Sequence, residues 1–199
     1  MQLLRRLTFL AALTLSTMGC GSKEDEPQPA PVPAAEFALY RSIYYPATAE
    51  TTGIRYAPIE IKTSGALSEQ ELTLHFSGSA GPDAITFTLP GQQLTSGLTG
   101  TYTLQSLPNP AEGVADVWYV FTRAEAPGST QGSIYGSHMH QLSGYLKITA
   151  FDRQRRLISG EYEVTMDNIS DPYDSNWGPS PIRRCNLEIG GSFKNMPLK

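Results

Sequence analysis

The chain has 199 residues, of which 40% are hydrophobic and 17% are charged, and its formal net charge is −4 at pH 7. This length suits one domain with at most a tail. The hydrophobic content is sufficient for a core, which excludes a collagen-like or fully disordered chain. The net negative charge argues against a nucleic-acid-binding protein, because such proteins are basic.

The beginning of the chain has the organisation of an export signal. Arg5 and Arg6 provide a positive start, and residues 7–18 form an apolar run with only Thr and Ser as polar members. The run is shorter than the ~20 residues that a membrane-spanning helix needs, so it predicts a secretory signal peptide. The ending Gly19-Cys20 resembles the bacterial lipobox, in which cleavage before the cysteine leaves a thiol that carries diacylglycerol. We therefore expect lipidation at Cys20, whereas an ordinary signal peptide with an incidental cysteine is the alternative.

The segment after the lipidation site has the composition of a tether. Residues 22–26 read SKEDE, which is similar to the lysine-then-acidic export signal of Bacteroidota lipoproteins and predicts the cell surface of the outer membrane. A generic solvated tether is the alternative. Alternating prolines over residues 27–33 favour an extended polyproline II conformation. We predict a lipoprotein signal peptide over residues 1–19, the lipidated cysteine with a disordered Pro-rich spacer over 20–35, and a single all-β domain over 36–199.

The remainder of the chain shows the pattern of β-strands. Apolar and polar residues alternate with a period of two, as in Leu72, Leu74 and Phe76, and clusters of Gly, Pro, Asn, Asp and Ser separate these runs. The pattern predicts an antiparallel β-barrel or β-sandwich of about nine or ten strands and no long helix. The expected strands cover residues 37–45, 56–63, 71–77, 84–89, 100–105, 115–122, 133–141, 143–151, 157–166 and 185–193.

The hairpin expected around residues 152–156 carries a family resemblance. Residues 144–152 read GYLKITAFD, and residues 157–164 read LISGEYEV. They are similar to a recurring hairpin of small Bacteroidota outer-membrane lipoproteins of unknown function, with the pattern Gly-x-Val-x-Ile-Thr-x-x-Asp followed by Ile-Ser-Gly-Thr-Phe-x-Phe. Residues 100–102 and 189–193 also match the Gly-x-Tyr and Gly-x-Phe positions of that family. The resemblance implies a lipocalin-like β domain and implies no activity.

No motif in the sequence predicts catalysis. The chain lacks a Gly-x-Ser-x-Gly elbow, a phosphate-binding Gly loop and a His-Glu-x-x-His motif. Glu161 and Glu163 lie opposite the apolar face of their strand, so we expect them to face water rather than form a glycosidase pair. Lipidation of Cys20 would leave Cys185 as a lone thiol without a disulfide partner. Two preceding arginines favour a Cys185 thiolate, and a small apolar core residue is the alternative.

Two groups of residues support metal hypotheses. His138 and His140, at positions i and i+2, would share one face of a strand and could chelate zinc, with His75 as a third ligand. Solvated strand ends are the alternative. Residues 167–178 carry three carboxylates and two amides, and calcium prefers such oxygen ligands. Turn formation explains the same composition, so apart from the covalent lipid we expect no cofactor.

The same loop contains two aromatic residues, Tyr173 and Trp177, which we predict to bind a ligand at the mouth of the domain. The alternative is that Trp177 folds back and closes that end. The leading hypothesis is a non-catalytic module that binds a glycan or a small amphiphile. The alternative is a structural or interaction subunit of an outer-membrane complex, and an enzyme is the third. Expected partners are the membrane, through the lipid, and an unidentified ligand or protein. Nucleic acid is not an expected partner. The arginines at residues 153–156 form a basic hairpin tip, but in an acidic protein we interpret this tip as a solvated loop rather than a nucleic-acid-binding patch.

Overall fold

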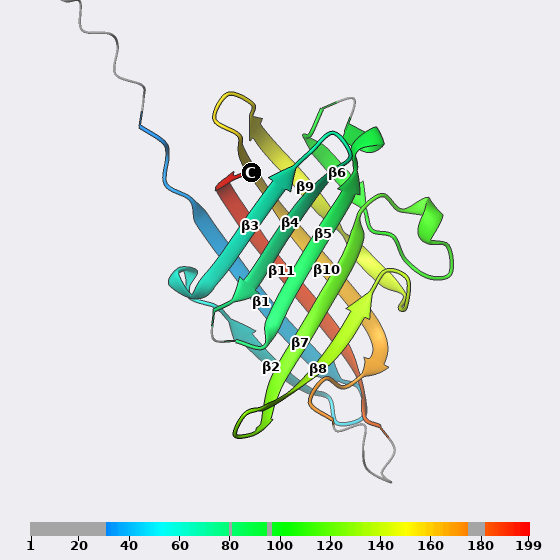
Figure 1. Ribbon diagram of the computed structural model, residues 1–199. Helices are drawn as coiled ribbons and strands as arrows, with labels where there is room; N and C mark the ends of the chain where they lie inside the picture. The colour runs from blue at the N-terminus through cyan, green and yellow to red at the C-terminus, as the bar shows by residue number, and fades with distance from the viewer. Residues whose placement is uncertain (1–30, 80, 95–96, 175–181) are drawn as a thin grey trace, which may run out of the picture. The chain divides into compact units, whose positions relative to one another are not determined.

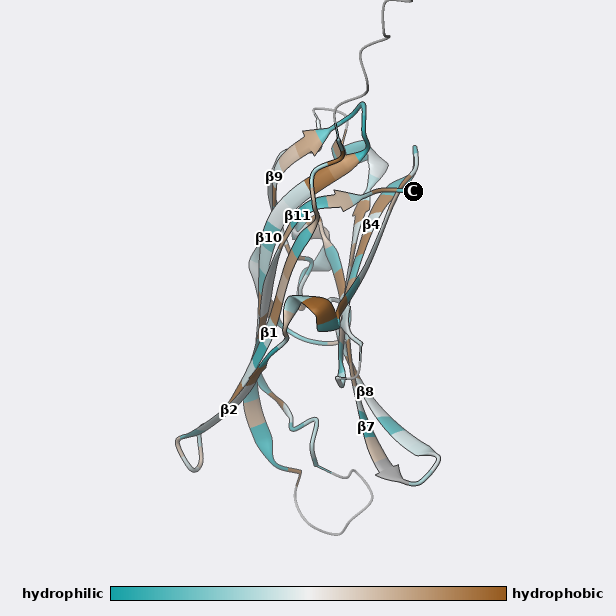
Figure 2. Cartoon of the chain, turned by 90° about the vertical axis from the view of Figure 1, so that its left-hand side faces the viewer, coloured by the Kyte–Doolittle hydropathy of each residue, from teal (hydrophilic) through white to brown (hydrophobic). Residues whose placement is uncertain are grey.

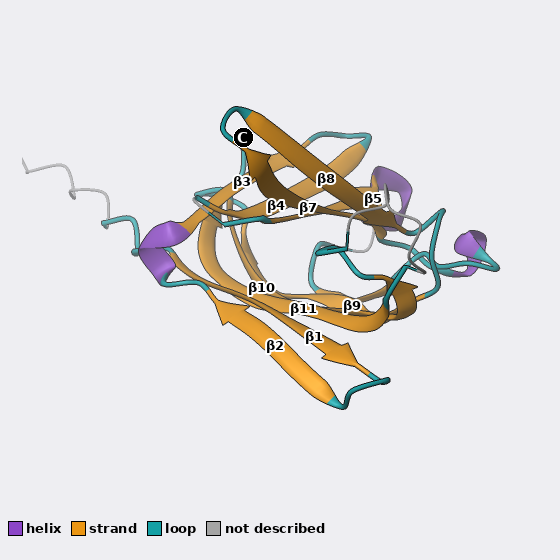
Figure 3. Cartoon of the chain, turned by 90° about the horizontal axis from the view of Figure 1, so that it is seen from below, coloured by secondary structure: helices purple, strands orange, loops and turns teal. Residues whose placement is uncertain are grey.

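The computed structural model describes residues 31–79, 81–94, 97–174 and 182–199. The predicted signal peptide, Cys20 and the spacer up to residue 30 lie outside these residues. Val32–Lys199 forms one compact unit that contains every described strand and its own hydrophobic core. The described strands form two antiparallel sheets that pack face to face (Figure 1; Figure 3).

The larger sheet has six strands in the order β2-β1-β11-β10-β9-β6, and each neighbouring pair is antiparallel. Its strands are β1 (Glu36–Tyr45), β2 (Glu50–Arg55), β6 (Gly100–Thr103), β9 (Leu142–Asp152), β10 (Leu157–Ser170) and β11 (Arg184–Pro197). The first described strand, β1, pairs with the last, β11, so the two ends of the domain lie side by side.

The smaller sheet has five strands in the order β3-β4-β5-β7-β8. Its strands are β3 (Ile61–Leu67), β4 (Glu71–Gly78), β5 (Asp83–Pro90), β7 (Asp116–Ala126) and β8 (Ser129–Gly136). Three 3₁₀ turns lie in the connections: η1 (Pro58–Glu60), η2 (Gly91–Leu94) and η3 (Pro110–Glu112). The described residues contain no helix with the length and apolar character that crossing a membrane would require.

The core lies between the sheets because alternate residues of each strand point inward. Leu72, Leu74 and Phe76 of β4 are fully buried, as the period of two predicts. The ring of Phe76 lies 4.9 Å from that of Tyr162 on β10 and 5.3 Å from that of Phe193 on β11. Aromatic contacts therefore join the two layers. Figure 2 shows these layers from the side, and they diverge toward the end where β2, β7 and β8 lie.

The all-β prediction and its sandwich alternative are confirmed, whereas the barrel alternative is wrong. Within the described residues each sheet has two edge strands, and the two sheets are linked through two isolated bridges, Gly65 to Leu198 and Leu104 to Ala115, rather than through a continuous strand pairing. The lipocalin-like closure implied by the family resemblance is therefore not observed. The physical reason is that two stacked sheets bury alternating apolar residues as well as a closed barrel does.

Several strand predictions also need correction. The described chain has eleven strands, and β2 is the one that was not predicted. Its residues are largely exposed, so they show no apolar alternation in the sequence. The strand expected over 56–63 begins only at Ile61, after the 3₁₀ turn that starts at Pro58. The strand expected over 133–141 is β8, which ends at Gly136. The hairpin of β9 and β10 around residues 153–156 is confirmed.

Candidate functional site

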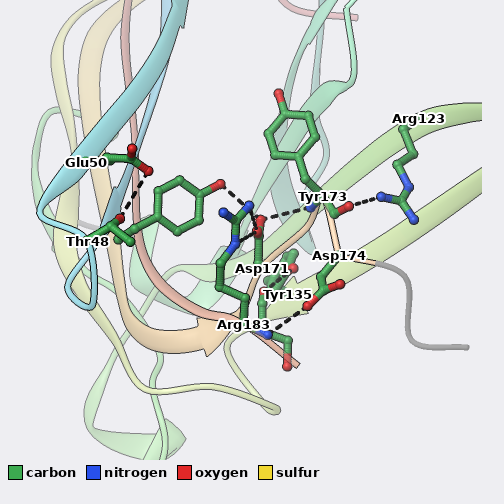
Figure 4. A network of polar contacts seen from close by, with 10 residues as sticks. Thr48, Glu50, Arg123, Tyr135, Asp171, Tyr173, Asp174 and Arg183 are labelled. Carbon is green, nitrogen blue, oxygen red and sulfur yellow. Dashed lines mark hydrogen bonds and ion pairs between the residues drawn. The ribbon is translucent and has the colours of Figure 1, made fainter. Parts of the chain in front are cut away.

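Tyr173, a predicted ligand-binding residue, follows β10 at the end of the sandwich where hairpin β7–β8 turns (Figure 4). Its backbone N–H donates to Oδ1 of Asp171 at 2.9 Å, and its carbonyl oxygen accepts from Nη1 of Arg123. Its hydroxyl accepts from Nη2 of Arg41 at 2.9 Å. Its ring meets the ring of Phe121 edge-on, with the centroids 4.8 Å apart. The backbone, hydroxyl and ring of Tyr173 are thus each held by a contact, and 44% of the residue's surface stays exposed.

Beneath Tyr173, Arg41 is buried with Asp83, at 4% and 2% exposure. Nε of Arg41 lies 3.4 Å from Oδ1 of Asp83, whose carboxylate also accepts hydrogen bonds from the hydroxyls of Tyr56 and Tyr119. Burial alone would lower the pKa of Arg41, but the charge of Asp83 raises it, so the guanidinium remains positive. The Arg41 guanidinium lies 5.3 Å from the centre of the Tyr173 ring. Arg41 of this buried ion pair therefore contacts both the hydroxyl and the ring of Tyr173.

A second buried carboxylate holds the loop that carries Tyr173. Asp171 accepts from Nε of Arg183 at 2.7 Å and from the hydroxyl of Tyr45 at 3.3 Å. The Arg183 guanidinium lies 4.1 Å from the centre of the Tyr45 ring. The backbone N–H of Arg183 donates to Oδ2 of Asp174 at 2.7 Å. Asp171 and Asp174 are therefore occupied by protein donors, as Figure 4 shows.

A cleft of about 350 Å³ opens beside Tyr173. Its lining residues include Tyr173, Phe121, Arg123, Thr122 and Thr130, and of the two aromatic residues only Tyr173 is exposed. This volume is at the lower end of the range of small-molecule sites, about 300–1,000 Å³. The cleft therefore offers an aromatic surface, a cation and hydroxyl groups to a small polar ligand.

The other predicted site residues have varied positions. Trp177 and Cys20 lie outside the described residues. Residues 167–170, the start of the segment that we predicted to be an acidic loop and considered as a calcium site, instead belong to β10. Glu161 and Glu163 lie half-buried on the strand positions that alternate with the buried ones, and Glu161 accepts from Nζ of Lys147 at 2.9 Å.

The histidines do not share one strand face. His75 lies on β4, where Nδ1 is 2.9 Å from Oγ1 of Thr86, and burial lowers the pKa of this imidazole. His138 and His140 lie in the turn after β8, so the prediction that they share a strand is wrong. In the part of the chain that the structure describes, no group of three or more His, Cys, Asp or Glu side chains is placed to hold a metal ion.

Cys185 is fully buried at the start of β11. Burial, followed by the charge of Asp171, raises the pKa of its thiol to about 12, and Arg183 only partly opposes these effects. The thiolate hypothesis is therefore wrong, and the alternative of a small apolar core residue is confirmed. The neighbouring arginines do not activate the thiol because Arg183 is already paired with Asp171.

The sequence analysis did not identify the ion pairs that Arg41 forms with Asp83 and Arg183 forms with Asp171. One signal was present for Arg41, which occupies an inward position of β1 between Leu39 and Ile43. A charged residue in an apolar register indicates a buried partner, because an isolated buried charge is costly. Nothing in the sequence identifies Asp83 as that partner.

Comparisons of the chain with protein-family models, curated proteins and solved structures find no match. The family resemblance of the β9–β10 hairpin therefore stays a prediction.

The tyrosines at this end make stability dependent on alkaline pH. Burial raises the pKa of Tyr45 and Tyr135 to about 12, and it raises that of Tyr56 and Tyr119 in the same direction. The unfolded tyrosine pKa is about 10, so the stabilisation is fully present below pH ~10 and is lost as the pH rises toward the folded value. We expect the free energy of unfolding, measured by urea denaturation, to fall steadily above pH ~10. A constant value up to pH ~11 would contradict this expectation.

Proposed function

We propose that this chain is a non-catalytic binding module that is anchored by a lipid on Cys20 at the outer surface of the outer membrane. Its ligand is a glycan, bound in the cleft beside Tyr173. The observation that carries this proposal is the combination of rigidity and exposure at Tyr173, which is fixed by both its backbone and its side chain and remains 44% exposed. The anchor and the surface location rest on the sequence of residues 1–26.

A fixed aromatic ring suits sugar recognition. A sugar ring has apolar C–H faces and polar hydroxyl edges, so it can stack on Tyr173 while its hydroxyls meet polar groups around the cleft. Arg123, Thr122 and Thr130 line the same cleft and supply such groups. Because the ring is already held before the ligand arrives, binding loses little side-chain entropy.

The buried charges at this end also favour a binding role. Replacing a buried ion pair by apolar residues of similar volume often leaves stability unchanged or improves it. The pair of Arg41 and Asp83 is therefore weakly explained by stability alone. Both ion pairs contact Tyr173, since Arg41 donates to its hydroxyl and the buried carboxylate of Asp171 accepts from its backbone N–H. This arrangement supports a role in positioning the exposed ring.

The proposal is tested by glycan-array screening of the chain from Gly21 onward, followed by titration of the glycans that bind. This form retains the whole compact unit and omits the predicted signal peptide and lipid. We expect Tyr173→Ala to weaken binding by at least about tenfold, as truncating a central aromatic contact commonly does. Tyr173→Phe keeps the ring and should retain most of the affinity.

Tyr44→Ala is the matched control, because Tyr44 is similarly exposed but lies on β1 away from the cleft. It should bind like the original protein. If Tyr173→Ala binds glycans as tightly as the Tyr44 variant does, the cleft is not the site.

A second candidate function is supported by the outer face of the smaller sheet. Trp118 of β7 and Ile134 of the edge strand β8 are both exposed, and the register of the two strands places them on the same face. Exposed apolar residues on an edge strand are typical of protein interaction sites. Crosslinking followed by a pull-down distinguishes the two roles. An interaction role requires that a stable partner protein is recovered, whereas glycan binding does not.

A further inference from the structure

A larger cleft, of about 830 Å³, lies at the opposite end of the sandwich from Tyr173. It is bordered by the turn between β3 and β4, by η2 and by the hairpin of β9 and β10. These segments gather at the top of Figure 1, whereas hairpin β7–β8 and the end of β10 lie at the bottom. The cleft is therefore a separate feature from the proposed glycan site.

The inner wall of this cleft is apolar. Leu67, Leu94, Leu98 and Phe151 line it. Leu98 belongs to the buried core, and the other three side chains are half-buried and pack against that core. Half-buried apolar side chains that meet around one opening can gain further burial by contacting an apolar ligand.

The rim of the cleft carries a cation without a partner. Of the hairpin arginines, Arg156 donates to the carbonyl oxygens of Leu67 and Leu198, both at 3.2 Å, and Arg155 lies 3.9 Å from Asp152. Arg153 lines the cleft, is exposed, and makes no hydrogen bond or ion pair with any described residue.

Opposite charge at the rim is limited. Glu69, in the turn between β3 and β4, is the acidic residue in the lining, and both Arg153 and Arg156 line the same cleft. Arg156 is engaged by oxygens of Leu67, Leu198 and Lys199, so it is the exposed guanidinium of Arg153 that favours an anionic group at the mouth. A guanidinium pairs with a carboxylate or a phosphate through charge-assisted hydrogen bonds, which are stronger than neutral ones.

We propose that this cleft binds an amphiphile with one acyl chain and an anionic head group. The acyl chain lies along Leu67, Leu94, Leu98 and Phe151, and the head group pairs with Arg153. The volume of the cleft lies within the range of small-molecule sites. The site is independent of the glycan proposal because the two clefts have no lining residue in common.

The test uses the chain from Gly21 onward and dodecyl phosphate below its critical micelle concentration, with displacement of a dansyl-labelled undecanoic acid as the signal. We expect saturable binding. Arg153→Gln should weaken dodecyl phosphate binding by about tenfold, the usual effect of losing a hydrogen bond to a charged group. The same variant should leave the binding of dodecanol unchanged, because that alcohol carries no charge.

Two further variants complete the design. Arg155→Gln is the matched control, since it removes a charge from the same hairpin but from a residue that does not line the cleft. It should bind dodecyl phosphate like the original protein. Leu94→Asp should weaken the binding of both amphiphiles, because it places a charge in the apolar wall. Circular dichroism confirms that each variant is folded.

Membrane lipid is the other source of the same chemistry, and it is examined with phosphatidylglycerol and phosphatidylcholine vesicles. Binding of vesicles without saturable binding of monomeric dodecyl phosphate would overturn the proposal, since a surface attraction would then suffice. Equal losses in Arg153→Gln and Arg155→Gln would also overturn it. Tyr173→Ala should leave dodecyl phosphate binding unchanged, so failure at one cleft is distinguishable from failure at the other.

Discussion

Asp83→Ala is expected to lower the free energy of unfolding by about 3–5 kcal/mol, the cost of breaking a buried ion pair by removing one partner. The substitution leaves Arg41 charged at 4% exposure with no counter-charge from Asp83. It also removes the acceptor for the hydroxyls of Tyr56 and Tyr119. An uncompensated buried charge is costly because the low-dielectric interior solvates it poorly.

Urea denaturation of the chain from Gly21 onward measures this loss. Asp167→Ala is the control, since Asp167 is an exposed aspartate on β10 and should change the free energy of unfolding little. The double variant R41M/D83A should regain part of the lost stability because no buried charge remains. A loss in Asp83→Ala as small as that in Asp167→Ala would contradict the role of the ion pair.

Phe76→Ala is expected to lower the free energy of unfolding by about 3–5 kcal/mol, as truncation of a fully buried phenylalanine commonly does. The Phe76 ring lies 6.4 Å from that of Phe87 within its own sheet. It also contacts Tyr162 and Phe193 of the opposite sheet. Removing it leaves a cavity between the layers, which rigid strands on both sides cannot close.

Thermal and urea unfolding check this prediction, with Ser77→Ala as the control. Ser77 is the next residue of β4, lies half-exposed and contributes no ring to the core, so its truncation should have little effect. If Phe76→Ala loses no more stability than Ser77→Ala, the aromatic contacts do not hold the two sheets together.

Local pattern decided how well individual strands could be predicted. The β9–β10 hairpin was predicted because its apolar alternation is regular and a short polar segment separates its strands. β2 was not predicted because an exposed edge strand buries no side chains and leaves no alternation in the sequence. β8 was misplaced at its start because its first residues are mostly exposed.

The candidate sites were predictable only in part. Tyr173 became a candidate because an aromatic residue in a polar loop is unusual, but the contacts that hold it were not predicted. Its hydroxyl meets Arg41, which is 132 residues away in the sequence. The cleft at the opposite end was not predicted, because its apolar wall comes from separate turns whose residues resemble ordinary core residues.

By itself, the sequence determined that the described domain is built from antiparallel strands, since the period of two is a property of neighbouring residues. Only the tertiary structure decided between a sandwich and a barrel, because both bury the same alternating residues. Only the tertiary structure brought Arg41 to Asp83 and Tyr173 to Arg41. Such contacts depend on which strands become neighbours, and that choice is made by the packing of the whole chain.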